Sequence, residues 1–324
     1  MKTLFSGIQP SGDIHIGNYL GAIRNWVRLL DKYQCIYCIV DYHAITIEYD
    51  VQEMLSRIIG AATVNIAAGL DPEKCILFRQ SDVVQHTELA WVLNTVTPMG
   101  DLERMTQFKD KSRQHASNVN AGLFTYPVLM AADIMLYKAE AVPVGDDQIQ
   151  HLELCREITR KFNNRFGEVF PEAQPLLSES PRILGLDGKS KMSKSLGNTI
   201  SLVDSPELIR EKLATAVTDE NRKRRKDPGN PDVCNLFTMH KGFSTAEQLK
   251  WVDEGCRSAS IGCLECKKLL ADNMLADIAP IQERIAEFAK KPDLVRQILD
   301  EGARKCRVIA EKTMDEVHGV MGFK

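Results

Sequence analysis

No stretch of this sequence is apolar for long enough to cross a bilayer, and its first residues do not resemble a secretory signal. The chain also lacks a strong charge, because 41 Lys and Arg residues stand against 44 Asp and Glu residues. A net charge of −3 excludes a general electrostatic attraction to nucleic acid, so any RNA contact must come from a local basic patch. We therefore expect a cytoplasmic protein with neither a membrane nor a DNA partner.

The common phosphate-binding loops are absent as well, since neither GxxxxGK[ST] nor GxGxxG occurs. Residues 3–30 instead predict a strand, a glycine-rich loop and a helix with Leu20, Ile23 and Val27 on one face. This order directs backbone N–H groups and a helix N-terminus to one place, where a phosphate could bind. Gly17 would allow a bulky planar ligand to approach the backbone, because glycine has no Cβ.

Strand and helix patterns alternate in the first part of the chain. Apolar runs at residues 35–40 and 75–78 predict buried parallel strands, and residues 58–68 and 88–93 have helical periodicity. This alternation indicates an α/β domain with a Rossmann-like, doubly wound parallel sheet, whose ligands bind at the carboxyl ends of the strands. We expect this catalytic domain at residues 1–190, a linker loop at 191–205, an α-helical domain at 206–291 and a C-terminal helix at 292–324 that packs back on the first domain.

Two short motifs point to a family. His15-Ile16-Gly17-Asn18 resembles the HIGH signature of class I aminoacyl-tRNA synthetases, with asparagine in the last place. Residues 191–195 (KMSKS) match the second signature of that class at all five positions, and nearby glycines suggest a mobile loop. The alternatives are an ordinary strand-to-helix turn and a solvated basic loop. Further blocks resemble bacterial tryptophanyl-tRNA synthetases, at residues 5–12, 41–46, 103–109, 126–134 and 143–148.

The resemblance implies activation of L-tryptophan with ATP, followed by transfer to the 3′ end of tRNA(Trp). The attacking carboxylate is already anionic, so the reaction needs positioning and neutralisation of phosphate charge, and no general base. We expect catalytic roles for Lys191, Lys194 and Lys111, although Lys111 could be an ordinary surface charge. Mg²⁺ would bridge the phosphates without a dedicated protein cage. The implied ATP-binding residues are Gln9, Pro10, Ser11, Gly17, Asn18, Gly145, Asp146, Asp147, Ile183, Lys191, Met192, Ser193, Lys194 and Ser195.

Recognition of tryptophan requires an apolar slot and an acceptor for the indole N–H, which can only donate. Asp133 fits this role, because it follows the apolar residues 128–132, where an unpartnered carboxylate would be costly. A salt bridge inside a helix is the alternative. The other residues expected to line the slot or to hold the ammonium group are Gln148, Phe5, Val40, His43, Tyr126, Met130 and Val142, several of which also suit a plain core.

Six of the nine cysteines form two groups, whereas Cys75, Cys155 and Cys306 are isolated and suit structural roles. Cys35 and Cys38 lie in a predicted strand and suit small buried side chains on opposite faces. Cys234, Cys256, Cys263 and Cys266 have the spacing C-x21-C-x6-C-x2-C, and four thiolates suit Zn²⁺ or a [4Fe–4S] cluster. The spacing resembles the C-x22-C-x6-C-x2-C signature of a subset of bacterial tryptophanyl-tRNA synthetases with a [4Fe–4S] cluster. We therefore expect an iron–sulfur cluster, with zinc or free thiols as the alternative.

The basic residues 222–226 (RKRRK) precede this cysteine set and predict contact with the tRNA backbone, although such runs are often only solvated loops. The resemblance also implies a homodimer that binds one tRNA across both subunits. Three other functions remain open: a tyrosyl-tRNA synthetase, a nucleotidylyltransferase-like ligase that forms a small-molecule adenylate, and a non-catalytic RNA-binding protein. The complete lysine loop argues against the last, because a binding module does not need a mobile phosphate loop.

Overall fold

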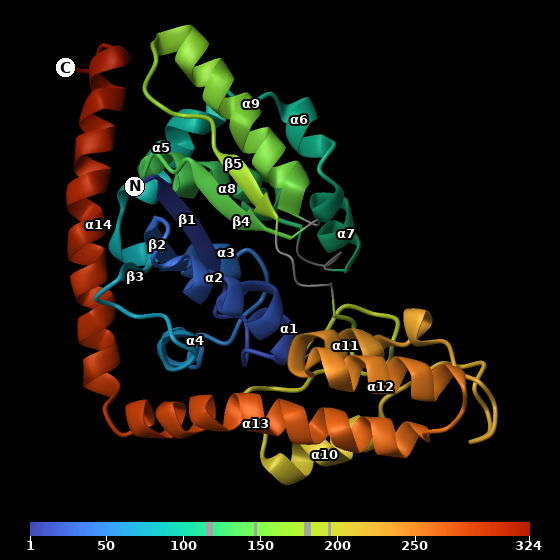
Figure 1. Ribbon diagram of the computed structural model, residues 1–324. Helices are drawn as coiled ribbons and strands as arrows, with labels where there is room; N and C mark the ends of the chain where they lie inside the picture. Colours follow the sequence, from blue (N-terminus) through green and yellow to red (C-terminus); the bar gives the residue numbers. More distant parts are fainter. Residues whose placement is uncertain (115–118, 146–147, 178–182, 194–195) are drawn as a thin grey trace. The chain divides into compact units, whose positions relative to one another are not determined.

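The computed structural model of the protein describes residues 1–114, 119–145, 148–177, 183–193 and 196–324, without the side chains of residues 110, 111 and 114. The chain forms two compact units (Figure 1). Unit 1 comprises Met1–Ser11, Trp26–Ser178 and Lys291–Lys324, and unit 2 comprises Gly12–Asn25 and Glu179–Lys290. Residues 12–25 therefore belong with the second compact unit, although the sequence suggests one catalytic domain for residues 1–190.

Unit 1 is built on a parallel five-stranded sheet with the strand order β3-β2-β1-β4-β5. The chain runs outward from β1 to β3 and then returns to place β4 on the other side of β1, so the order reverses between β1 and β4. Such a switch point is where doubly wound folds bind ligands. The predicted Rossmann-like sheet is confirmed, with β1 at Thr3–Ile8, β2 at Gln34–Ile39, β3 at Cys75–Arg79, β4 at Ala141–Val144 and β5 at Gln174–Leu177.

Alternating residues of the strands pack on opposite faces of the sheet. Ile36 and Cys38 belong to a core shared with α5 (Gln85–Asn94), α8 (Ala121–Leu136), α9 (Ile149–Phe166) and α14 (Pro292–Val320). Tyr37 faces the other way, where its ring stacks on Trp26 at a centroid distance of 4.8 Å and its hydroxyl donates to the Trp26 carbonyl (3.1 Å). Further helices of this unit are α3 (Asp41–Ala44), α4 (Met54–Ala67), α6 (Met99–Glu103) and α7 (Thr106–Gln114). The helix α2 (Arg24–Leu29) begins in unit 2 and ends in unit 1.

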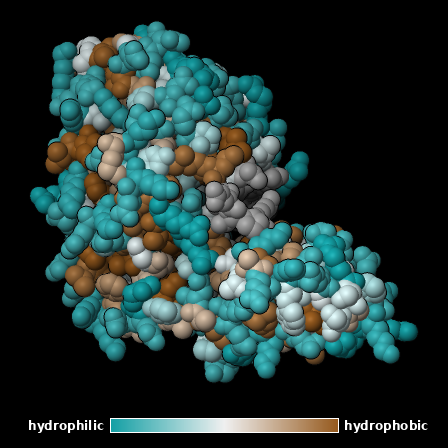
Figure 2. Space-filling model, viewed as in Figure 1, coloured by the Kyte–Doolittle hydropathy of each residue, from teal (hydrophilic) through white to brown (hydrophobic). Residues whose placement is uncertain are grey.

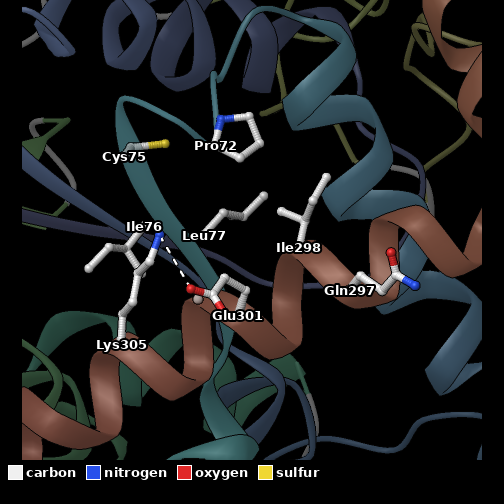
Figure 3. Close-up of a pocket in the computed structure, with 9 residues that line it drawn as sticks. Pro72, Cys75, Ile76, Leu77, Gln297, Ile298, Glu301 and Lys305 are labelled. Atoms are coloured by element: carbon white, nitrogen blue, oxygen red, sulfur yellow. Dashed lines mark ion pairs between the residues drawn. The ribbon is translucent and has the colours of Figure 1, made fainter.

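The C-terminal helix α14 packs directly on the backbone of β3. A Cβ atom at Gly302 would lie 2.0 Å from the Leu77 carbonyl oxygen, so only glycine permits this approach. Beside this contact is a cavity of about 250 Å³ between Pro72, Ile76 and Ile298, with Glu301 and Lys305 at its side (Figure 3). None of the residues predicted for ATP, tryptophan or metal lines this cavity.

Unit 2 contains a segment from near the beginning of the chain, residues 12–25, together with the helical region. Residues 14–16 pair with residues 200–202, through hydrogen bonds from Ile16 N–H to the Ile200 carbonyl (2.9 Å) and from Leu202 N–H to the Ile14 carbonyl (3.0 Å). The predicted α-helical domain contains one long continuous helix, α13 (Cys263–Ala289). The other helical elements are α1 (Ile16–Asn18), the π-helical turn η1 (Tyr19–Ile23), α10 (Pro206–Thr215), η5 (Pro231–Val233), α11 (Asn235–Phe243) and α12 (Ala246–Arg257).

Within the described ranges, no helix is both long and apolar enough to cross a membrane. Hydrophilic residues predominate on the face shown in Figure 2, and hydrophobic residues form separate groups there. This distribution agrees with the charged content of 26%.

Replacing Gly302 by alanine should destabilise unit 1, because the new Cβ would push α14 away from β3. We expect the free energy of unfolding to fall by about 1–3 kcal/mol, measured by urea denaturation. Gly319→Ala in the same helix is the control, since a Cβ there meets nothing within 4 Å. That change should stabilise the protein by about 0.5–1 kcal/mol, and equal effects of the two substitutions would contradict the packing described here.

Candidate active site

Unit 1 contains a buried carboxylate with three hydrogen-bond donors. Asp133, in α8, is 2% exposed. Its Oδ1 accepts hydrogen bonds from Gln80 Nε2 (2.7 Å) and His86 Nδ1 (2.6 Å), and its Oδ2 accepts one from His43 Nε2 (2.7 Å). Burial alone raises the pKa of Asp133, but the hydrogen bonds from His43 and His86 outweigh burial and hold the pKa at about 2. The carboxylate is therefore ionised at neutral pH.

The sheet places these donors, and further hydrogen bonds fix them. His43 lies in α3 directly after β2, and Gln80 begins the short helix η2 (Gln80–Asp82) directly after β3. The Gln80 Oε1 atom accepts the Tyr42 N–H (3.1 Å), so the amide must turn its Nε2 toward Asp133. His86 is buried at the start of α5. The carboxyl ends of two neighbouring strands thus converge on one carboxylate.

The other residues predicted for tryptophan also lie in unit 1, in different settings. The Tyr126 hydroxyl lies 2.8 Å from His151 Nε2, and the Tyr126 ring meets the His43 ring edge-on with centroids 6.3 Å apart. Gln148 precedes α9 and is half-buried, and its N–H donates to the Gly145 carbonyl (2.9 Å). Phe5, Val40 and Val142 are buried in the core of unit 1, and Met130 packs against that core.

In unit 2 the first motif forms a cap at the start of α1. The Asn18 N–H donates to His15 Nδ1 (3.3 Å), and the His15 N–H donates to Asn18 Oδ1 (3.2 Å). Burial and the nearby charge of Lys191 lower the pKa of His15 to about 4. His15 is therefore neutral at pH 7, and its proton is on Nε2. A Cβ at Gly17 would lie 3.6 Å from Met192 Sδ, so the two motifs lie together within this unit.

Asn198 organises the lysine loop of the second motif. This side chain is 5% exposed, its Oδ1 accepts the Ser193 N–H (2.8 Å), and its Nδ2 donates to the Lys191 carbonyl (3.2 Å) and to Asp187 Oδ2 (3.3 Å). Gly185 also packs closely against the Asn198 side chain, because a Cβ at this position would lie 2.1 Å from Asn198 Nδ2. The role of Asn198 was not predicted from the sequence. The Gly197-Asn198 pair, one residue after the motif and typical of a tight turn, was the available signal.

The remaining predicted ATP-binding residues are distributed over both units. Ile183 is buried in unit 2, next to Leu184, which forms a β-bridge with Lys191. Gln9, Pro10 and Ser11 follow β1 in unit 1, and Gly145 follows β4. Asp146, Asp147, Lys194 and Ser195 lie outside the described residues, as does the side chain of Lys111, whose backbone lies in α7.

The family description "tRNA synthetases class I (W and Y)" matches residues 1–276 of the chain. The chain belongs to this class I synthetase family. It is 52% identical to the tryptophan–tRNA ligase of Deinococcus radiodurans, over 100% of this chain and 99% of that protein. Identity to the Thermotoga maritima tryptophan–tRNA ligase is 44%, over 99% of each chain. The Campylobacter jejuni tryptophanyl-tRNA synthetase, solved with ADP and tryptophan, superposes with a TM-score of 0.85 at 38% identity, over 99% of this chain and 100% of that one.

Two of the hydrogen-bond donors to Asp133 in this synthetase were not predicted from the sequence. Gln80 and His86 stand 53 and 47 positions away from Asp133 in the chain, so their contact depends on how α5 and the end of β3 pack on α8. A local signal did exist for His86. It stands three and seven positions before the apolar Leu89 and Leu93, which places it on their buried side of the helix, and a buried histidine requires polar partners.

The four predicted metal-ligating cysteines of the synthetase line one small cavity of about 30 Å³ in unit 2. Burial, followed by the proximity of the other three thiols, raises the pKa of Cys266 to about 12. A Cβ at Gly229 would lie 2.6 Å from Cys256 Sγ, so glycine gives this thiol room beside the cavity. Among the described residues, no group of three or more His, Cys, Asp or Glu side chains is placed to hold a single metal ion. The four cysteines that line the cavity are Cys234, Cys256, Cys263 and Cys266.

The five basic side chains of residues 222–226 in this synthetase differ in their contacts: two bind to neighbouring backbone, and three are exposed. Arg222 turns inward, where Nη2 donates to the Ile261 carbonyl (2.6 Å) and Nη1 lies 3.7 Å from Cys256 Sγ. Arg225 donates to the carbonyls of residues 259 and 260 and pairs with Glu265 (3.3 Å). The other three basic side chains are exposed and form no salt bridge with a described residue; they are Lys223, Arg224 and Lys226.

Proposed function

We propose that this synthetase activates L-tryptophan with ATP to tryptophanyl-adenylate and pyrophosphate, and then transfers tryptophan to the 3′ end of tRNA(Trp). The observation that carries the proposal is the buried, ionised Asp133, with three protein donors on its two oxygens. A carboxylate can accept about four hydrogen bonds, so one position on Oδ2 remains for the indole N–H. Relatives named tryptophan–tRNA ligase that match along the full length support the same substrate.

In the first step, a carboxylate oxygen of tryptophan attacks the α-phosphorus of ATP. A new O–P bond forms, the bond from the α-phosphorus to the bridging oxygen breaks, and pyrophosphate leaves. Mg²⁺, when bound, would neutralise part of the phosphate charge. The attacking group is already anionic, so the protein needs to supply positive charge and hydrogen-bond donors. Lys191, Lys194 and Lys111 would supply the charge. The neutral His15 would donate through Nε2.

In the second step, a ribose hydroxyl of the terminal tRNA adenosine attacks the carbonyl carbon of the adenylate, and AMP leaves. Contact with the tRNA backbone would come from Lys223, Arg224 and Lys226. Their exposure supports this role, since an unpaired surface cation can exchange its counterion for a phosphate. Arg222 and Arg225 would hold the loop in shape through their carbonyl contacts.

The family also implies a homodimer. Exposed apolar side chains on α5 support a second copy as partner. Val84, the N-cap of α5, and Trp91 within it are 62% and 74% exposed and stand seven positions apart, which places them on one side of the helix. Met99, 66% exposed, follows at the start of α6. Light scattering that found a monomer at micromolar concentration would contradict this part of the proposal. The cytoplasmic location stays a prediction.

For the cysteine set we propose a [4Fe–4S] cluster, with zinc as the weaker alternative. Four thiols around one cavity match the donor set of such a cluster. The spacing C-x21-C-x6-C-x2-C, which resembles that of the cluster-bearing subset of bacterial tryptophanyl-tRNA synthetases, favours the cluster over zinc. When bound, the cluster would connect three separate segments of unit 2 and stabilise the region next to the basic run.

The activation step is tested by ATP–pyrophosphate exchange with each standard amino acid. Tryptophan alone should support exchange, and Lys194→Ala should lower the rate by about a hundredfold or more, because one phosphate-neutralising charge is lost. Lys189→Ala is the matched control in the same loop, since Lys189 is exposed and pairs with Glu220 (2.8 Å). Exchange driven by tyrosine, or a Lys194→Ala variant with the parental rate, would contradict the proposal.

The tRNA contact is tested by changing Lys223, Arg224 and Lys226 together to glutamine. Binding of tRNA should weaken, and the slope of log K against log salt should decrease by about 1 per neutralised contact. Amino acid activation should stay at the parental rate and serves as the internal control. An unchanged salt slope would show that these side chains do not touch the RNA.

The cysteine set is tested by purification under anaerobic conditions. The protein should be brown and contain about four iron atoms per chain, and Cys263→Ala should abolish both properties. Cys75→Ala, which removes a buried thiol in unit 1, should leave iron content unchanged. Colourless protein with stoichiometric zinc would contradict the cluster.

A further inference from the structure

His86 has no part in the activation chemistry, yet every polar atom of its ring is engaged. The side chain is completely buried, with Nδ1 2.6 Å from Asp133 Oδ1 and Nε2 2.8 Å from the Tyr137 hydroxyl. Its ring stacks on Phe78 with an interplanar angle of 25° and a centroid distance of 5.7 Å. The ring can therefore neither turn nor shift without breaking a buried hydrogen bond.

The partners of His86 determine where its proton lies. The ionised Asp133 can only accept, so Nδ1 must carry a proton. Burial holds the pKa of Tyr137 well above its usual value, so its hydroxyl keeps its proton and can donate to Nε2. The result is a directed chain of hydrogen bonds, from Tyr137 through His86 to Oδ1 of Asp133.

We infer that His86 is a positioning residue for tryptophan specificity. Together with Gln80 it occupies both acceptor positions of Asp133 Oδ1, so that only Oδ2 is available to the indole N–H. His86 does not touch the ligand and acts through Asp133. The inference rests on the proposed function, in which Asp133 receives the indole N–H.

Loss of the His86 Nδ1 donor would leave Asp133 Oδ1 with one hydrogen bond fewer. Asp133 would then take up a water at Oδ1 or rotate, and the remaining acceptor would no longer stay in one place. A site held loosely by its supporting residues binds its ligand less tightly, although its chemistry is unchanged. The effect should therefore appear in the KM for tryptophan, whereas kcat and the KM for ATP change little.

The test is a double-mutant cycle on tryptophan-dependent pyrophosphate exchange, with His86→Leu, Asp133→Asn and the double variant. His86→Leu should raise the KM for tryptophan about 10- to 100-fold, as expected when a buried charge loses a donor. His86→Asn keeps an N–H near the Nδ1 position and should restore most of the loss. The double variant should be no worse than Asp133→Asn alone, because His86 acts only through that carboxylate.

Unfolding temperatures separate positioning from general destabilisation. Thr159→Val is the matched control: Thr159 is a buried polar residue of α9 that bonds the Cys155 carbonyl (3.0 Å), and this change should not alter the KM for tryptophan. If His86→Leu does not fold, Tyr137→Phe is used, with an expected KM increase of about two- to tenfold from the loss of one hydrogen bond.

Additive effects in the cycle, or a normal KM in a folded His86→Leu or Tyr137→Phe variant, would overturn this inference and leave the proposed function intact. Wild-type protein without tryptophan-dependent exchange would overturn the proposed function and this inference with it.

Discussion

A charged carboxylate in an apolar interior persists only if its oxygens are hydrogen-bonded, and Asp133 shows what that constraint requires. Three donors reach it from the ends of two adjacent strands and from a neighbouring helix. Without them, burial would favour the neutral acid, which would be a poor acceptor for an indole N–H. The hydrogen bonds keep the carboxylate ionised, and an ionised carboxylate favours a ligand that supplies one further hydrogen-bond donor.

The proposed activation site depends on a neutral histidine, whereas the tryptophan proposal depends on a charged carboxylate. His15 is kept neutral by burial and by the nearby charge of Lys191, so that its ring is a donor with a defined proton. The lysine loop is held by one buried amide, Asn198, and by a glycine that lets this amide approach. Positive charge and fixed donors are sufficient here, because the nucleophile of the reaction arrives already ionised.

Sequence reasoning succeeded where the signal was local. The strands β2 and β3 were predictable from continuous apolar runs. The position of Asp133 after an apolar stretch also indicated that its carboxylate needs buried hydrogen-bond partners, whereas its role in tryptophan binding stays a prediction. Gln80, His86 and Asn198 were not identified, because their roles depend on contacts between distant segments or on one turn. The pairing of residues 14–16 with residues 200–202 is of the same kind, and it places the first motif in unit 2. Charge patterns identified the basic run but could not show that Arg222 and Arg225 turn inward.

The central claim is that the remaining acceptor on Asp133 recognises the indole N–H. The most direct measurement compares kcat/KM for L-tryptophan with that for L-3-(benzothien-3-yl)alanine, in which sulfur replaces the N–H with little change of shape. The account predicts at least about a hundredfold preference for tryptophan, because the analogue leaves a buried acceptor unpaired. Equal kcat/KM values for the two amino acids would contradict it.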